Sequence, residues 1–209
     1  MSENVISLMK IDFHVHTSAS MGKNTTAEMV AIAKKRGLDA IAITDRETLK
    51  GWKNFKPSNF TIIPGVELLT DKGLVLIYGI QKLPEKRELD FIIDWAKDWN
   101  YLVVPAHFMD KKKESLGESA LESFKIVEAI NGNSSAGFCK EAVTLCTSSG
   151  VKFMSNSGAK QVRDLGEFYN NVEIDSTEWQ DIMSVVEKGE FSPRVKFPRL
   201  LKSIKSSFF

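Results

Sequence analysis

The sequence has no long hydrophobic run and almost no excess of charge of either sign. Its 209 residues include 28 Lys and Arg against 27 Asp and Glu, so the formal net charge is +1. A transmembrane helix needs about 20 consecutive apolar residues, and no stretch approaches that length. The first residues also lack the basic and apolar regions of a signal peptide. These absences favour a cytoplasmic location, and the balanced charge gives no overall attraction to nucleic acid or anionic lipid.

Cysteine is scarce, and the two cysteines do not fit a disulfide. Cys139 and Cys146 lie in a helical pattern at a spacing that separates them by about 10 Å, at about 1.5 Å per residue. A disulfide requires Cα atoms within about 7 Å of each other. We therefore expect two reduced thiols in the core, as is usual for a protein inside the cell.

The chain also lacks internal repeats, low-complexity tracts and any change of composition that would mark a linker. Its length suits one domain with a sizeable hydrophobic core. We therefore predict a single domain over residues 1–190, followed by a basic amphipathic tail over residues 191–209. Within the tail, a short helix is expected from Pro198 onward.

Two basic stretches are candidate contact surfaces. The tail is expected to pack against the domain as a closing helix, and the alternative is a contact for nucleic acid, a membrane or another subunit. The lysines at 111–113 could meet a phosphorylated substrate, but we interpret them as part of a solvated loop.

Short apolar runs alternate with helical patterns along the chain. Such runs are typical of strands that are covered on both faces. The expected strands are 8–13, 40–44, 61–63, 74–77, 102–104, 126–130, 151–154 and 172–174, and the expected helices are 26–36, 85–100, 136–149, 163–169 and 178–188. This order predicts an α/β fold with a parallel sheet, and about seven units favour a closed or distorted barrel. The chemistry of such folds lies at the carboxyl ends of the strands.

Histidine is rare, and two of the three histidines follow the first expected strand, in the segment DFHVH. Residues separated by one position on a strand point the same way, so His14 and His16 should face one pocket. Two neutral imidazoles on a rigid strand end suit zinc, manganese or iron. A pair of hydrogen-bonded core histidines is the alternative that this motif alone leaves open.

Polar side chains stand at the ends of the other expected strands as well. Taken singly, each could be a turn residue or a helix N-cap. Taken together, they indicate a polar site at one end of the fold. The residues are Asp45, Arg46, Glu67, His107, Glu128, Asn131, Asn156 and Lys160.

Six segments, in this order, resemble the PHP (polymerase and histidinol phosphatase) family of metal-dependent phosphoesterases. They are IDFHVHTSAS, GLDAIAITDRETLKG, IIPGVELLTDKG, PAHF, VEAINGN and SNSGAKQVRDLGEFYN, and they cover roughly residues 10–190. The resemblance implies a distorted seven-stranded TIM-like barrel. It also implies a cluster of up to three divalent metal ions.

The ligand set that the resemblance implies is only partly present. His14, His16, Glu67 and His107 remain, with Asp45 and Glu128 as neighbouring acids. Non-ligating residues stand at the other family positions, namely Met21, Arg46, Leu74, Gly158 and Lys160. The substitutions at 21, 46 and 160 remove the third metal. The four retained ligands suffice for about one divalent ion of zinc, manganese or iron.

The resemblance therefore implies a divergent phosphoesterase with a reduced metal site. In the family, the metal lowers the pKa of a water molecule, and the resulting hydroxide attacks phosphorus. Arg46 and Lys160 would hold the phosphate in place of the missing metal, and Asp45 would orient or deprotonate the water. The substrate would be a phosphorylated small molecule or a nucleotide, and an oligonucleotide stays open.

A catalytically inactive barrel that serves as a binding or scaffold subunit is the alternative. On this interpretation Arg46 and Lys160 pair with Asp45, Glu67 and Glu128, because an unpaired buried charge is costly. A network of salt bridges would then fill the former metal site. The two interpretations differ in whether a metal is bound.

Overall fold

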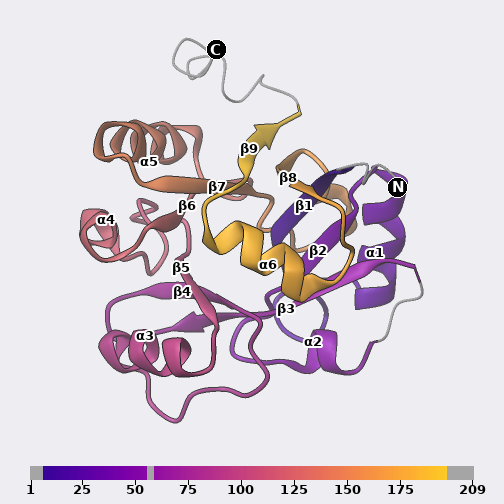
Figure 1. Ribbon diagram of the computed structural model, residues 1–209, viewed down its shortest axis with the longest axis horizontal. Helices are drawn as coiled ribbons and strands as arrows, with labels where there is room; N and C mark the ends of the chain where they lie inside the picture. The colour runs from indigo at the N-terminus through magenta and orange to yellow at the C-terminus, as the bar shows by residue number, and fades with distance from the viewer. Residues whose placement is uncertain (1–6, 56–58, 197–209) are drawn as a thin grey trace, which may run out of the picture.

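The computed structural model describes residues 7–55 and 59–196, which form a mixed α/β fold around a curled sheet (Figure 1). The strands are β1 (Ser7–Val15), β2 (Ala40–Ile43), β3 (Thr61–Leu69), β4 (Leu74–Tyr78), β5 (Leu102–Pro105), β6 (Ile126–Asn131), β7 (Lys152–Asn156), β8 (Phe168–Ile174) and β9 (Ser192–Val195). The helices are α1 (Thr26–Lys35), α2 (Lys50–Lys53), α3 (Leu89–Asp98), α4 (Ala120–Ser123), α5 (Ala136–Ser149) and α6 (Trp179–Glu187).

The strands form one large sheet and one pair. The large sheet has seven strands in the order β5-β4-β3-β2-β1-β8-β9, and β6 pairs with β7 in a separate two-stranded sheet. The prediction of an α/β fold is confirmed, with a curled seven-stranded sheet in place of a parallel barrel sheet. A closed TIM-like barrel is not confirmed, because no backbone ladder joins the two sheets within the described part of the chain.

The prediction of a parallel sheet is only partly right. Strands β1, β2 and β3 are parallel, whereas β4, β5, β8 and β9 join their neighbours antiparallel. The reason at β3 and β4 is the length of their connection. Only residues 70–73 separate the two strands, in a turn where Thr70 N donates to Gly73 O. Parallel strands need a crossover of a dozen or more residues, so this hairpin can only be antiparallel.

Apolar side chains fill the inside of the curl. Alternate residues of β1, such as Met9, Ile11 and Phe13, point inward and meet side chains from the other strands. Helix α6 contributes Ile182 and Val186 to this same cluster and covers it on one side (Figure 1). The carboxyl ends of the parallel strands are left to carry polar residues.

The other helices cover the outer faces of the strands. Helix α1 packs on the outward side chains of β1 and β2, α3 packs on those of β3 and β4, and α4 and α5 pack on β6. Both cysteines lie in the α5 layer, buried and unpaired with each other, which confirms the prediction of reduced thiols. Within the described residues, no helix combines the length and the apolar character needed to cross a bilayer.

Two segments near the carboxyl end differ from expectation. The helix predicted over 163–169 is wrong: Gly166 has a φ of 83°, which ends a single 3₁₀ turn (Val162–Asp164), and β8 begins at Phe168. Strand β9 was not predicted, and it lies within the stretch that the sequence assigns to the tail. The helix expected from Pro198 onward lies outside the described residues.

Candidate metal site

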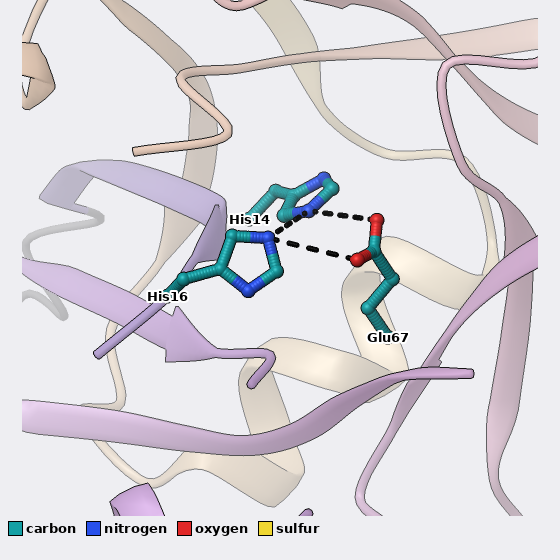
Figure 2. A group of neighbouring side chains, drawn as sticks. All are labelled: His14, His16 and Glu67. Carbon is teal, nitrogen blue, oxygen red and sulfur yellow. Dashed lines mark hydrogen bonds and ion pairs between the residues drawn. The ribbon is translucent and has the colours of Figure 1, made fainter. Parts of the chain in front are cut away.

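An irregularity in β1 sets the direction in which the side chains of His14 and His16 point. The register of β1 against β2 shifts between Asp12 and Val15, which is a bulge that changes the direction of the following side chains. Phe13 then packs inside the curl, and Val15 packs outward against the α1 layer. His14 and His16 are both buried and turn toward a common centre (Figure 2).

His14, His16 and Glu67 bring their polar atoms together (Figure 2). The two Nε2 atoms are 3.1 Å apart. Glu67 Oε1 lies 3.4 Å from His14 Nε2, and Glu67 Oε2 lies 3.7 Å from His16 Nε2. Bonds of about 2.0–2.1 Å to a tetrahedral ion place neighbouring ligand atoms about 3.4 Å apart. The three donors therefore have the spacing of ligands to one ion, and the prediction that both imidazoles face one pocket is confirmed.

His107 approaches the same oxygen of Glu67 as His14 does. Its Nε2 is 3.3 Å from Glu67 Oε1, and its ring stacks near that of His14. The backbone of His107 has a φ of 33°, a conformation that costs a non-glycine residue about 1–3 kcal/mol and persists only where its surroundings fix it. Here Asp110 N donates to His107 O, and His107 N donates to Glu128. Three predicted ligands thus form one cluster, and the fourth contacts its carboxylate.

Glu128 accepts hydrogen bonds from both His14 and His107, at atoms other than those that face Glu67. Its Oε1 accepts from His14 Nδ1 (2.9 Å) and Asn156 Nδ2 (2.8 Å), and its Oε2 accepts from His107 N (2.8 Å) and Asn131 Nδ2 (3.2 Å). A carboxylate offers about four lone-pair positions, and these donors fill them. Glu128 is therefore a positioning residue, since its hydrogen bond to Nδ1 leaves His14 Nε2 to face Glu67.

The pKa values of His14 and His16 follow from this arrangement. Burial alone would lower the pKa of His14, but the carboxylates of Glu128 and Glu67 outweigh it and raise the pKa to about 10. Burial, together with the positive charge of His14, lowers the pKa of His16 to about 3. The two Nε2 atoms are close enough to form a hydrogen bond, which requires a proton on one of them. These pKa values place that proton on His14.

The residues present fit a divalent metal ion. Glu67 Oε2 is buried and has no hydrogen-bond partner among the described residues, and an unsatisfied carboxylate oxygen in a core is costly. A cation beside it would also take the place of the proton shared by His14 and His16. Imidazole nitrogen with carboxylate oxygen is a donor set suited to zinc, manganese and iron.

A polar pocket opens above these candidate ligands. Its volume is about 240 Å³, and its basic lining residues outnumber its carboxylates. The basic residues are Arg46, Lys112, Lys113 and Lys160, and the carboxylates are Glu67 and Glu114. The pocket is therefore suited to an anionic ligand that reaches down to the histidines.

The salt-bridge network of the alternative prediction is not observed within residues 7–55 and 59–196. There the ion pairs of Glu67 and Glu128 are formed with histidines. Arg46 pairs with Glu114 at the rim of the pocket, and Lys160 makes no ion pair with any residue that the structure describes. The predicted phosphate-binding cations therefore face the pocket, and neither forms an ion pair with Glu67 or Glu128 in the described ranges.

Lys113 differs from the solvated loop that we expected. Its Nζ donates to Asn131 Oδ1 (3.3 Å) and Ser134 Oγ (3.2 Å) and lies 3.7 Å from Asp110 Oδ2. Burial lowers the pKa of this lysine. The interpretation as a solvated loop is wrong for Lys113, although it describes the exposed Lys111.

Asp45 occupies a different setting from the other predicted residues. It does not line the pocket, and its carboxylate accepts hydrogen bonds from Thr17 N (2.7 Å), Thr17 Oγ1 (2.6 Å) and Ser20 Oγ. The Cα of Gly51 lies so near that an added Cβ would fall 1.9 Å from Asp45 Oδ2. This geometry gives Asp45 the role of holding the loop after His16.

The positions at which the chain departs from the family pattern converge in the pocket, where Met21, Arg46, Leu74, Gly158 and Lys160 all contribute to the lining. Gly158 has a φ of 58°, and a Cβ there would lie 2.6 Å from the amide of Asn131. The aspartate that the resemblance implies at 158 has no room, because Asn131 fills that space.

The sequence did not reveal the residues that orient the ligands. The sequence identifies Glu128 only as a neighbouring acid, and it predicts no role for Asn156. Asn170, which hydrogen-bonds Asn156, was not singled out. A signal was available, because asparagine is disfavoured in strands and yet ends β7 at Asn156 and occurs inside β8 at Asn170.

The chain is similar in sequence to a known protein family and to a known protein. A model of the PHP domain matches residues 12–179. An uncharacterized protein from Methanocaldococcus jannaschii is 25% identical over 126 residues, which cover 53% of this chain and 74% of that protein.

Solved structures with this fold include two that match most of the chain. PsfC from Pseudomonas syringae superimposes with a TM-score of 0.73 at 16% identity, covering 96% of this chain and 97% of PsfC. A two-domain protein from Bacteroides vulgatus, containing a predicted PHP-like metal-dependent phosphoesterase, gives a TM-score of 0.70 at 16% identity. The match covers 91% of this chain but only 65% of that protein. At such identities the similarity shows the fold.

Proposed function

The chain belongs to the PHP domain family, and from this premise we propose that it is a metal-dependent phosphoesterase with a reduced metal site. The observation that carries the proposal is the buried cluster of His14, His16 and Glu67, whose donor atoms have the spacing of ligands to one ion. His107 is the fourth proposed ligand. When bound, a divalent cation would supply a Lewis acid for the phosphoryl group and activate water at neutral pH.

The rim of the pocket supplies the proposed phosphate contacts. Arg46 offers a planar fork of donors, and Lys160 offers an ammonium group that has no carboxylate partner in the described ranges. Both face the volume above the metal ligands. This placement supports our proposal that they bind phosphate oxygens. For Asp45 we replace the proposed activation of water by the positioning of the loop that follows His16.

The size of the pocket bears on the substrate. About 240 Å³ is smaller than the roughly 300–1,000 Å³ of sites that enclose a drug-sized ligand. We propose that the pocket takes the phosphoryl end of a phosphorylated small molecule or nucleotide, whose remainder stays outside. Contact with nucleic acid through the basic tail over residues 191–209 stays a prediction, since residues 197–209 of that tail lie outside the described residues.

Hydrolysis assays test this function directly. Para-nitrophenyl phosphate and its bis-ester, with zinc or manganese, report turnover of a monoester and a diester. We expect Arg46→Ala and Lys160→Ala each to lower kcat/KM by about 10- to 100-fold, since a hydrogen bond to a charged group contributes about 1.5–3 kcal/mol. Lys111→Ala, at an exposed site outside the pocket, should leave kcat/KM unchanged.

Turnover that is equal in these variants and the wild type would sink the phosphate-binding roles. A wild-type protein that binds metal but hydrolyses neither ester would instead favour the inactive scaffold.

Glu114 is expected to weaken phosphate binding. Its carboxylate pairs with the guanidinium of Arg46, so an incoming phosphate must displace it. Exposed ion pairs contribute about 0.2–1 kcal/mol, and Glu114→Gln should therefore tighten binding of inorganic phosphate by about 2- to 5-fold. Isothermal titration of metal-free protein measures this. In an Arg46→Ala background the gain should largely disappear, and an undiminished gain there would contradict the competition.

A further inference from the structure

The edge between β7 and β8 is joined by side chains. In the described residues no backbone ladder links these strands, although they lie side by side. The amide of Asn170, on β8, bridges the edge: Ser155 N donates to its Oδ1 (3.0 Å), and its Nδ2 donates to Ser155 O (2.9 Å). This side chain thus makes the pair of hydrogen bonds that a neighbouring strand's backbone would otherwise make.

From the same amide, a series of hydrogen bonds leads to the proposed metal ligands. Asn170 Nδ2 donates to Asn156 Oδ1 (2.9 Å), Asn156 Nδ2 donates to Glu128 Oε1 (2.8 Å), and that oxygen lies 2.9 Å from His14 Nδ1. All four side chains are buried, with exposed fractions of 0–1%. We call this row of side chains the amide relay.

The backbone N–H of Ser155, at the Asn170 end of the relay, fixes the direction of each hydrogen bond in it. Ser155 N requires an acceptor, so the oxygen of Asn170 faces it, and the NH₂ group of Asn170 faces Asn156. Asn156 must then present its oxygen to Asn170, and it accepts from Phe13 N as well. Its own NH₂ group is thereby directed at Glu128, which remains an acceptor for His14 Nδ1.

We propose that Asn170 is a positioning residue for the metal site, and that the amide relay sets the orientation and tautomer of His14 through Asn156 and Glu128. Asn170 itself touches none of the proposed ligands. The inference rests on the metal site of the proposed function. It does not require that the chain hydrolyse phosphate esters, because its consequence is a change in metal affinity.

The test compares two neighbouring asparagines of β8. Asn170→Asp keeps the shape but replaces the donor that faces Asn156, whereas Asn171→Asp alters a side chain outside the relay, whose Oδ1 has no hydrogen-bond partner among the described residues. Loss of an outer-shell partner typically weakens metal binding by about 10- to 100-fold. We expect that loss of zinc affinity in Asn170→Asp and not in Asn171→Asp, measured by competition with a chromogenic chelator.

Nitrogen-15 NMR of the histidine rings supplies a readout that a general structural role would not give. In zinc-loaded wild type, His14 should carry its proton on Nδ1. In Asn170→Asp, the ring signals of His14 should shift while those of His107 stay, because His107 Nδ1 has no partner in the described structure. If Asn170→Asp does not fold, Asn170→Ser, which introduces no buried charge, is measured in its place.

The outcomes separate the two proposals. Wild-type zinc affinity in a folded Asn170 variant would overturn the relay and leave the proposed function standing. A zinc-loaded wild type whose His14 carries no proton on Nδ1, or a wild type that binds no zinc, would also overturn the relay. Weakened zinc binding in the Asn170 variants beside a wild type without phosphoesterase turnover would support the relay and reject the proposed function.

Discussion

Replacement of Glu67 by glutamine is expected to abolish metal binding. Glu67 lies between the imidazoles, with one oxygen near His14 and His107 and the other near His16. The amide keeps the size of the side chain but removes the only carboxylate of the proposed ligand set. The loss should exceed the roughly 10- to 100-fold effect of removing an outer-shell partner. Metal content is measured by elemental analysis of protein purified without chelator from medium supplemented with manganese and zinc.

His16→Ala, purified identically, should lose the metal in the same way. The matched control is Glu114→Gln, which neutralises another carboxylate of the same pocket without touching the cluster. It should retain the metal content of the wild type. Equal metal in Glu67→Gln and wild type would place any bound ion elsewhere, and no metal in any sample would make the scaffold function the working hypothesis.

Glu128→Gln is expected to destabilise the metal-free protein by about 3–5 kcal/mol, the usual cost of removing one partner of a buried ion pair. The glutamine amide would turn an NH₂ group toward donors such as Asn156 Nδ2 or His107 N. It would also leave the charge of His14 without its nearest carboxylate. Urea unfolding followed by circular dichroism measures the loss. Glu122→Gln, at an exposed acid in α4, should change stability by less than about 0.5 kcal/mol.

The cost of Glu128→Gln should depend on pH. The pKa of Glu128 falls from 4.5 to about 2, because His14 outweighs the effect of burial, so its contribution is present above pH 4.5 and is lost toward pH 2. The pKa of His14 rises from 6.5 to about 10, so its contribution is present below pH 6.5 and is lost toward pH 10. Glu67, His16 and Asp12 face the pair in both proteins. The difference in the free energy of unfolding between the wild type and Glu128→Gln should be largest between about pH 4.5 and 6.5. A difference that stays constant up to pH 10 would contradict the ion pair of Glu128 and His14.

The strands were predictable because their apolar runs are strong signals that tertiary packing did not override. All eight expected strands occur, and α5 has the expected bounds. The direction of pairing was not predictable from these runs. It depends on connections such as residues 70–73, where a four-residue turn enforces a hairpin. The helix expected over 163–169 failed because φ at Gly166 and the pairing of β8 with β1 and β9 outweighed a short helical pattern.

At the site, the sequence identified the groups that reach the pocket, and it missed those that orient them. His14 and His16 were found because strand periodicity and the chemistry of imidazole are both local properties. The role of Glu128 depends on four donors that come from distant segments, so no local pattern encodes it. Asp45 stands in a matching motif, yet its partners are in the loop after His16, and only the three-dimensional structure reveals them.

The seam between β7 and β8 has a consequence for local unfolding. Strands β6 and β7 with helix α5 can separate from β8 without breaking a backbone ladder, so we expect this unit to open locally at a lower free energy than global unfolding. Such an opening would carry Glu128 away from His14. By thermodynamic reciprocity, an ion that binds the closed form more tightly must also hold the seam closed. Metal occupancy would then be reported by amide hydrogen exchange across β6, β7 and α5.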